Sequence, residues 1–192
     1  MSVPEEVAVA DLVIRRLLED DAPALQAAVL ESLEHLRPWM PWVAFEPLSI
    51  DERRELLARW GREWQEGTQY GFGVFLGEQL AGVFGLHRRI GPGGLELGYW
   101  IHRRHTGRGY ATQAAAALTS VAFGLPDTTH VEIHHDKANL ASGRIPEKLG
   151  FRLVREESDG IEAPGETGVS CIWLIERDAW RPDAGARILA PR

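Results

Sequence analysis

Three strand-like segments joined by short turns occupy the middle of the sequence, and they limit the fold more than any other feature. Residues 70–76, 80–87 and 95–102 are rich in aromatic and branched side chains, and the turns between them contain Gly77 and the glycine-rich run 91–94. Short glycine-containing turns between such segments are typical of antiparallel hairpins. The segments therefore predict three consecutive antiparallel strands.

The rest of the chain alternates between helix and strand patterns. A helix is predicted over 19–36 with Asp20 as its N-cap, and a second runs from Ser49 to Gly67, because Ser49 and Glu52 have capping-box spacing. The other predicted elements are strands at 11–17, 130–136, 151–157 and 170–176 and helices at 109–125 and 139–150. This order predicts an α/β (α+β) fold, with a mixed, mostly antiparallel sheet of about seven strands and helices on both faces.

Length and composition exclude several classes of protein. The 192-residue chain has no run near the roughly 20 apolar residues that a membrane span needs, and no signal-sequence pattern at its start. Cys171 is the only cysteine, which favours a reducing cytoplasm, and the net charge of −7 argues against non-specific nucleic-acid binding and mildly favours amines as partners. We expect a soluble cytoplasmic protein that binds neither nucleic acid nor membrane, with one domain over 1–177 and a partly disordered tail over 178–192.

The stretch IHRRHTGRGY is basic in this acidic chain and lies between a predicted strand and a predicted helix. Its three arginines and two glycines are Arg103, Arg104, Arg108, Gly107 and Gly109. Main-chain N–H groups at the start of a helix bind anions, and glycine lets a ligand approach the main chain closely. We therefore predict a site for a ligand that carries more than one phosphate.

Two other phosphate-binding motifs do not match this turn. A P-loop needs a Gly-Lys pair, which the chain lacks. A dinucleotide fingerprint is interrupted by Thr112 in place of the third glycine, and the preceding strand belongs to a hairpin and not to a βαβ unit. The remaining alternative is a glycine-rich loop that only turns the chain.

Arg104, Gly107 and Gly109 match the pattern [QR]-x-x-G-x-[GA], which resembles the pyrophosphate-binding segment of the GNAT N-acetyltransferase superfamily. The segments LELGYWIHRRHTGRGYATQAAAAL and VEIHHDKANLASGRIPEKLGF are similar to the central half of that family, and LRPWMPW resembles its ribosomal-protein-alanine N-acetyltransferase branch. The resemblance implies a splayed sheet, acetyl-CoA or another acyl-CoA as cosubstrate, and an amine acceptor that is a small molecule or a protein N-terminus. It leaves open a monomer or a homodimer.

The resemblance also implies a coenzyme site along this strand, turn and helix. The residues that it assigns to coenzyme binding are Trp100, Ile101, His102, Arg103, Arg104, Thr106, Gly107, Arg108, Gly109, Tyr110, Ala111 and Asn139. In the resembled family the strand bulges and splays from its neighbour, and a free main-chain N–H stabilises the oxyanion. Here that segment is 100–102.

Acyl transfer to an amine requires a group that accepts the amine's proton, because an alkyl amine with a pKa near about 10 is almost fully protonated at pH 7. Glu96 is the first candidate, since desolvation at the centre of a sheet would raise its pKa. His87 is the second, because the hairpin brings it roughly opposite Glu96. The alternative for Glu96 is a structural ion pair with an arginine such as Arg88.

The departing thiolate requires a proton donor. Many members of the resembled family have a tyrosine where this chain has Pro146, whereas the ribosomal-protein branch uses a serine three residues after a helix-capping asparagine. Asn139 and Ser142 have this spacing, so Ser142 is the candidate that hydrogen-bonds the sulfur or relays a proton. The alternatives are a serine that bonds the backbone and an asparagine that serves only as N-cap.

The remaining motifs have two interpretations each. Trp39, Trp42 and Phe45 line the acceptor pocket or cover the gap between helices, and Trp60 and Trp64 have the spacing of packing residues. His130, Glu132 and His134 alternate along a strand as a metal site would, although the resembled family needs no metal, and no metal is expected. Cys171 lies on a closing strand, so direct transfer is expected, and the alternative function is an acyl-CoA-binding module without turnover.

Overall fold

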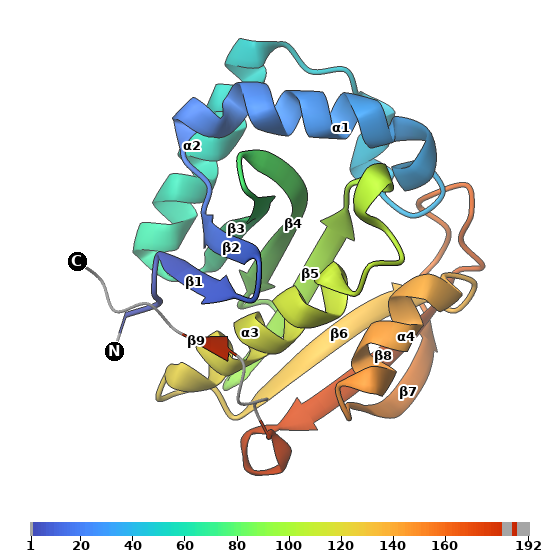
Figure 1. The fold of residues 1–192 in the computed structure, drawn as a ribbon. Coiled ribbons are helices and arrows are strands. Elements are labelled where there is room, and N and C mark those ends of the chain that lie inside the picture. Colours follow the sequence, from blue (N-terminus) through green and yellow to red (C-terminus); the bar gives the residue numbers. More distant parts are fainter. Residues whose placement is uncertain (1, 182–185, 188–192) are drawn as a thin grey trace.

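The computed structural model describes residues 2–181 and 186–187 and has a mixed sheet with helices on both faces (Figure 1). The helices are α1 (Ala22–Leu36), α2 (Ile50–Glu66), α3 (Tyr110–Gly124) and α4 (Leu140–Lys148). The strands are β1 (Glu6–Val9), β2 (Leu12–Arg16), β3 (Gln69–Leu76), β4 (Gln79–His87), β5 (Gly94–Ile101), β6 (His130–Asp136), β7 (Arg152–Ser158), β8 (Val169–Glu176) and β9 (Ala186–Arg187). Among the described residues, no helix combines the length and the apolar character that crossing a bilayer would require.

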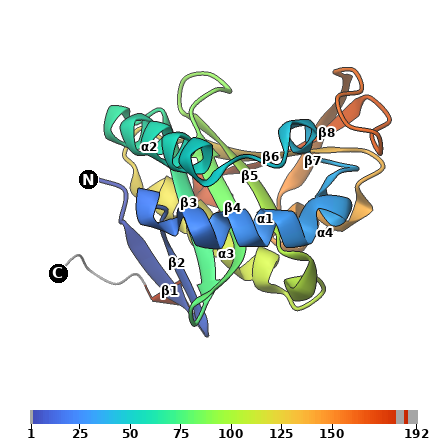
Figure 2. The same ribbon diagram turned by 90° about the horizontal axis from the view of Figure 1, so that it is seen from above.

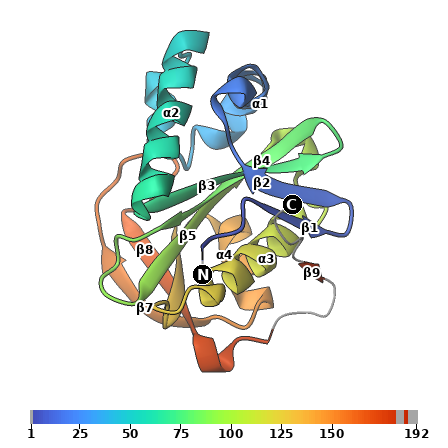
Figure 3. The ribbon, with the colours of Figure 1, turned by 90° about the vertical axis from the view of Figure 1, so that its left-hand side faces the viewer.

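The sheet has the order β7-β8-β6-β5-β4-β3-β2-β1-β9, and β5 with β6 is its parallel pair. Figure 3 shows α1 and α2 on one side of this sheet and α3 and α4 on the other, and Figure 2 shows α1 and α2 lying over β3 and β4. One buried cluster joins α3 to the sheet through Phe84, Leu97 and Leu118, and a second joins α1 and α2 to the opposite face. The predicted fold class is confirmed.

The seven predicted strands are all present, but the sheet of the described residues is larger than predicted. The added strands are β1 and β9, which pair with each other at one edge of the sheet. Each is only two to four residues long, so neither carries enough of an alternating pattern to be recognised alone. Both depend on pairing with residues that are distant in sequence or on a tight turn at Ala10.

The predicted helix ends are mostly confirmed. The Ser49 and Glu52 capping box forms at the start of α2, and Gly67 ends α2 in the left-handed conformation with φ of 73°. The prediction of Asp20 as the N-cap of α1 is wrong, because 19–21 form a short 3-10 turn and Asp21 precedes the helix. Asp21 is occupied by an ion pair with Arg15 at 2.7 Å, so it does not cap the helix either.

The two halves of the sheet diverge between β5 and β6. These strands pair only where Gly94–Glu96 meets His130–Glu132, although both continue beyond that point. The splay is therefore present, but the predicted bulge in β5 is not, since the β4–β5 ladder is in continuous register from His87 opposite Glu96 to Gly82 opposite Ile101.

The continuous ladder decides which β5 amides are free. The His102 N–H donates to Ala81 O at 2.9 Å, so it is not available to a ligand. In an antiparallel ladder the N–H groups of successive residues point to opposite edges, so residues two positions apart point to the same edge. The N–H of Trp100, two residues before His102, therefore also faces β4. Within 100–102, the N–H groups of Trp100 and His102 therefore face β4, and that of Ile101 faces the opening, as does the N–H of Tyr99 before it.

Packing against the core continues past the boundary expected at residue 178. Trp180 is buried between Phe123 and Phe151, with ring centroids about 6.5 and 6.4 Å away. Its indole N–H donates to Ser120 Oγ. Of the expected tail, 182–185 and 188–192 lie outside the described residues.

A buried ion pair fixes the segment between α1 and α2. Glu46 accepts two hydrogen bonds from Arg53 of α2, at 2.7 and 2.8 Å, and the two side chains are only 2% and 3% exposed. Arg53 also donates to Gln26 of α1. The pair thereby ties the segment 37–49, which carries Trp39 and Trp42, to both helices.

Removal of one partner of the Glu46 and Arg53 pair should leave the other charge buried without a counter-ion and so lower the stability of the fold. We expect Glu46→Ala to lower the free energy of unfolding by about 3–5 kcal/mol, because Arg53 is left without its counter-ion. Arg54 and Asp51 form a matched exposed pair, for which Asp51→Ala should cost less than about 1 kcal/mol. Urea unfolding of both variants gives the comparison, and equal small losses would contradict the structural role of the buried pair.

Candidate active site

A cavity of about 630 Å³ lies where β5 and β6 diverge. It runs from the loop after α1 to the start of α4. The predicted site residues that line it are Trp39, Trp42, Phe45, His87, Glu96, Trp100, Asn139 and Ser142. One cavity therefore contains the candidate catalytic residues and the aromatic residues predicted for the acceptor.

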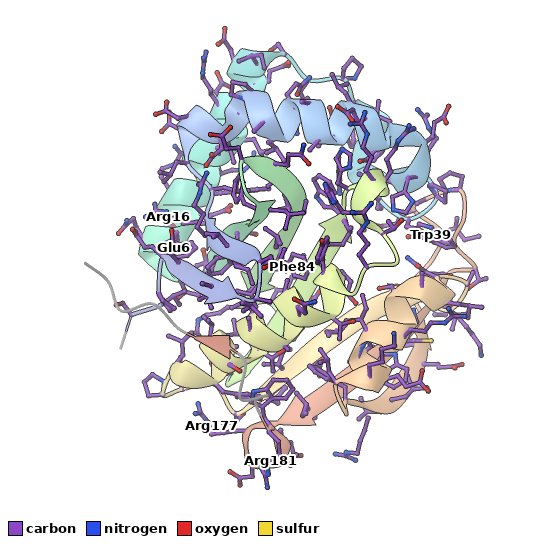
Figure 4. The ribbon with its side chains drawn as sticks, viewed as in Figure 1. Glu6, Arg16, Trp39, Phe84, Arg177 and Arg181 are labelled. Carbon is purple, nitrogen blue, oxygen red and sulfur yellow. The ribbon has the colours of Figure 1, made fainter. Side chains whose placement is uncertain are left out.

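The cavity has two faces because side chains alternate along β5. Trp100 packs with Val83 in the α1 and α2 cluster. Glu96 is four residues earlier on the same strand, so its side chain lies on the same face of the sheet. Tyr99 packs instead on Phe84 in the α3 cluster, with ring centroids 5.2 Å apart. Phe84 projects from the middle of the sheet in Figure 4. Glu96 and Tyr99 thus lie on opposite faces of the sheet, beside the opening that joins them.

Glu96 forms an ion pair with Arg89 and not with Arg88. Arg89 Nε donates to one carboxylate oxygen at 2.7 Å and Nη2 to the other at 2.5 Å. Burial disfavours the carboxylate, but the two bonds and the charge of Arg89 outweigh it, so the pKa of Glu96 lies below its ordinary value. The predicted rise in the Glu96 pKa is wrong because the sequence does not reveal this bidentate partner.

Arg88 has a different role. Its Nε donates to Gly67 O at the end of α2, and its guanidinium pairs with Asp127 at 2.9 Å. The two arginines follow the last residue of β4 and leave the strand in different directions. The expected kind of contact, an arginine on Glu96, is present, but the residue that makes it is the next one along the chain.

His87 lies directly opposite Glu96 in the β4–β5 register, as predicted. Its Nδ1 is 2.8 Å from Gln69 Oε1 on β3. Burial, with a smaller contribution from Arg89, lowers the pKa of His87 to about 4. The imidazole is therefore neutral near pH 7.

His134 is a third titratable side chain beside Glu96, and the prediction included it only as a metal ligand. Its Nε2 is 2.6 Å from Glu132 Oε2, and its Nδ1 is 3.9 Å from Glu96 Oε2. His130, in contrast, contacts Thr129. In the described part of the chain, no group of three or more His, Cys, Asp or Glu side chains is arranged to hold a metal ion.

Ser142 and Asn139 meet Tyr99 at the other face of the opening. The Asn139 side chain accepts a hydrogen bond from the Ser142 N–H at 3.2 Å and caps α4. The Ser142 hydroxyl donates to the Tyr99 oxygen at 3.2 Å, and the Tyr99 hydroxyl donates to the Ser142 carbonyl at 3.2 Å. Burial raises the pKa of Tyr99, which keeps this hydroxyl protonated. Sequence reasoning did not identify Tyr99. Tyr99 is three residues after Glu96, and side chains alternate along a strand, so the sequence does indicate that the two side chains lie on opposite faces of the sheet.

The basic turn lies beside this opening, between β5 and α3. Gly107 and Gly109 have φ of 73° and 81°, a region that other residues rarely adopt. In the described residues, no hydrogen bond occupies the N–H groups of 107–109. The remaining turn residues divide into exposed and covered groups. Exposed side chains belong to Arg103, Arg104, Thr106 and Arg108, and covered or half-covered ones to Ile101, His102, Tyr110 and Ala111.

Charge and free amides at this turn fit a diphosphate. A side chain at Gly107 would project into open space, so an incoming ligand can reach the main chain there. Arg104 pairs at its rim with Glu31 of α1 at 2.9 Å, and both side chains are largely exposed. His102 is buried and its Nδ1 accepts from the Arg104 N–H, so it shapes the turn.

Aromatic side chains form the end of the cavity near α1 and α2. Trp42 lies against Trp100, with ring centroids 6.2 Å apart, and Phe45 is 77% exposed at the rim. Trp39 lies toward the periphery of the molecule in Figure 4 and also lines the cavity. Trp64 is buried, as expected of a packing residue, whereas Trp60 both packs and lines the cavity.

Comparison with known proteins gives consistent results. The family model of the acetyltransferase (GNAT) domain matches residues 11–152. YdaF of Bacillus subtilis (strain 168), which has a provisional name as a ribosomal N-acetyltransferase, is 28% identical over 156 residues, or 80% of this chain and 85% of YdaF.

Two solved structures have the same fold. One is RimL, described as a ribosomal L7/L12 alpha-N-protein acetyltransferase in complex with coenzyme A, with a TM-score of 0.83, 23% identity and coverage of 91% of this chain and 99% of RimL. The other is the ribosomal-protein-S5-alanine acetyltransferase of Vibrio fischeri, with a TM-score of 0.80, 16% identity and coverage of 92% and 99%. Since the family model covers well over half of its length, the chain belongs to the acetyltransferase (GNAT) domain family.

Proposed function

We propose that this GNAT-type acetyltransferase transfers an acetyl group from acetyl-CoA to a primary amine, with a protein N-terminal α-amine as the favoured acceptor class. The observation that carries the proposal is the single cavity that crosses the sheet at the β5–β6 opening. It connects proton acceptors on one face with hydroxyl groups on the other, next to a turn with free main-chain amides. Direct transfer needs this arrangement, because both substrates must be present together.

The coenzyme end of the site is assigned to the basic turn and the start of α3. The N–H groups of 107–109 and the guanidiniums of Arg103 and Arg108 supply donors for a diphosphate. Bound acetyl-CoA supplies a thioester carbonyl that an amine can attack. The N–H groups of Tyr99 and Ile101 face the opening and are assigned to the developing oxyanion.

The amine end is assigned to Glu96, His87 and His134. The pKa values of Glu96 and His87 both lie below neutrality, so both groups are unprotonated at pH 7 and able to accept a proton. Because their pKa values are low, both groups are weak bases. A water molecule between them would take part in the proton transfer. Glu96 remains the first candidate, because its carboxylate lies in the cavity nearest the β5–β6 opening.

The leaving group end is assigned to Ser142, which Asn139 and Tyr99 hold in place. In the balanced reaction an N–H bond of the amine breaks and its proton goes to the base, the C–S bond breaks as the C–N bond forms, and the thiolate gains a proton. Ser142 is proposed to donate or relay that last proton. Burial raises the pKa of Tyr99, so its hydroxyl stays protonated beside Ser142.

The acceptor class rests on similarity and on the shape of the cavity. RimL and the Vibrio fischeri enzyme are described as ribosomal-protein acetyltransferases, and YdaF has a provisional name as a ribosomal N-acetyltransferase. The aromatic end formed by Trp39, Trp42 and Trp100 offers apolar walls to the residues that follow a terminal amine. A small-molecule amine with an apolar body would fit the same walls.

The activity is tested by measuring thiol release from acetyl-CoA with a panel of amines. We expect free thiol with peptides that have an unblocked N-terminus and none with acetylated controls. The rate should rise between about pH 6 and 9, because more of the amine is then unprotonated. Calorimetric binding of the coenzyme without thiol release for any amine would instead support a binding module.

The diphosphate assignment is tested with two glycines of similar backbone conformation. Gly107 and Gly77 both have positive φ, and both would place a Cβ in open space. Replacement of either by alanine should therefore cost similar stability, about 1 kcal/mol. Only Gly107→Ala should weaken coenzyme binding, by about tenfold, measured by calorimetry. Equal coenzyme affinity in the two variants would contradict the assignment.

The role of Ser142 is tested by Ser142→Ala. We expect kcat to fall on the order of 10²-fold with coenzyme affinity little changed, because the hydroxyl acts only as the thiolate leaves. Ser158, an exposed serine at the end of β7, provides the control substitution Ser158→Ala. An unchanged rate in Ser142→Ala would return this serine to a purely structural role.

A further inference from the structure

We propose that Arg89 recognises a carboxylate on the acceptor, so that the preferred substrates are amines with a carboxylate close to the reacting nitrogen, either an α-carboxylate or an acidic side chain on the following residue. The inference rests on the proposed function and defines its acceptor more narrowly. It concerns the ion pair between Arg89 and Glu96. Both residues flank one hairpin turn, so this pair does not join elements that are distant in the chain.

The ion pair is exposed on one side only. The Glu96 side chain is 9% exposed and that of Arg89 is 61% exposed, so the guanidinium lies between the carboxylate and solvent. Each carboxylate oxygen accepts one hydrogen bond from Arg89. An amine that approaches Glu96 from the cavity must therefore displace the guanidinium or share the carboxylate with it.

Displacement is costly unless each charge finds a new partner. A buried carboxylate that loses its only cation is destabilised, and the guanidinium prefers a planar anion with two oxygens. An acceptor with an ammonium and a carboxylate close together satisfies both at once. Its ammonium takes the place of the guanidinium on Glu96, and its carboxylate binds Arg89, so no charge is left unpaired.

The same exchange places the proton acceptor against its donor. Once the ammonium of the acceptor contacts Glu96, its N–H proton can pass to the carboxylate, and the amine lone pair is free for attack. The groups that face Glu96 are then His87 and His134, which are neighbours on β4 and β6. Arg89 would contact the acceptor and not the thioester, so its proposed contribution is to specificity, in addition to its effect on the pKa of Glu96.

The distribution of charge along the cavity supports this orientation. The three arginines of the lining come from α2 and from the turn that follows β4. Arg53 is locked against Glu46, whereas Arg59 is exposed and, within the described ranges, forms no ion pair. The lining carboxylates outside these pairs, Asp136, Asp159 and Glu166, lie on or beside the β7–β8 loop. A carboxylate on the acceptor is therefore attracted toward the end of the cavity that holds Arg59 and Arg89.

The test compares acceptors that differ only in one charge. The first pair is Ala-Asp-Trp-amide and Ala-Asn-Trp-amide, and the second is phenylalanine and phenylalaninamide, with rates expressed per concentration of the protonated amine, which is the form proposed to bind Glu96. We expect kcat/KM to be at least about tenfold higher for the carboxylate member of one pair. The pair that shows it identifies the carboxylate as a side-chain group or as the α-carboxylate.

Variants of the arginine complete the test. Arg89→Gln should bring both members of the pair to within about twofold, and Arg89→Lys should keep part of the preference because it keeps the charge but not the two parallel donors. Arg88→Gln, at the adjacent arginine that pairs with Asp127, should keep the full preference. Coenzyme affinity measured by calorimetry shows that each variant is folded.

Two results would overturn the inference. One is equal kcat/KM for both members of both pairs in the unmodified protein, and the other is a preference that survives Arg89→Gln. Either result leaves the proposed function intact, provided that thiol is released. Absence of thiol with every acceptor would instead refute the proposed function itself.

Discussion

The divergence of β5 and β6 is the constraint on which the rest of the site depends. Had the two strands continued to pair beyond Glu96 and Glu132, the N–H groups of Tyr99 and Ile101 would be bound within the sheet. The sheet would also separate its two faces completely. Because the strands part, the sheet keeps a continuous β4–β5 ladder on one side and leaves main-chain donors free on the other. A carboxylate and a pair of hydroxyl groups on opposite faces therefore line one cavity.

Two ion pairs in the molecule use the same chemistry at different degrees of burial. The Glu46 and Arg53 pair is covered on both sides and holds the α1–α2 segment in place. The Glu96 and Arg89 pair is covered only on the carboxylate side, so water and other molecules can reach its cation. A pair with both partners buried is fixed, whereas a pair with one exposed partner can exchange that partner for another ion. This difference is visible only in three dimensions, since both arginines lie seven residues from their carboxylates.

Local patterns in the sequence predicted the parts that depend on local physics. The Ser49 capping box, the Gly67 helix end, the Asn139 cap and the seven longer strands all follow from residues close together in the chain. The opposition of His87 and Glu96 followed from hairpin geometry. The incorrect predictions concern which side chains contact each other and the course of the β5 backbone. Arg88 and Arg89 are indistinguishable as sequence, Tyr99 gains its role from Ser142 on another element, and a splay need not involve a bulge.

The pairing of β1 with β9 has a consequence for the order in which the sheet is completed. Ala8 lies opposite Arg187, so the outer edge of β1 finds its partner only after nearly the whole chain has been synthesised. Such a distant contact has a high entropic cost of closure and forms late. Until then the N-terminal hairpin presents an open edge, to which another strand could add. A truncation before residue 186 would make that open edge permanent, with self-association as the hazard, while every residue of the cavity is still present.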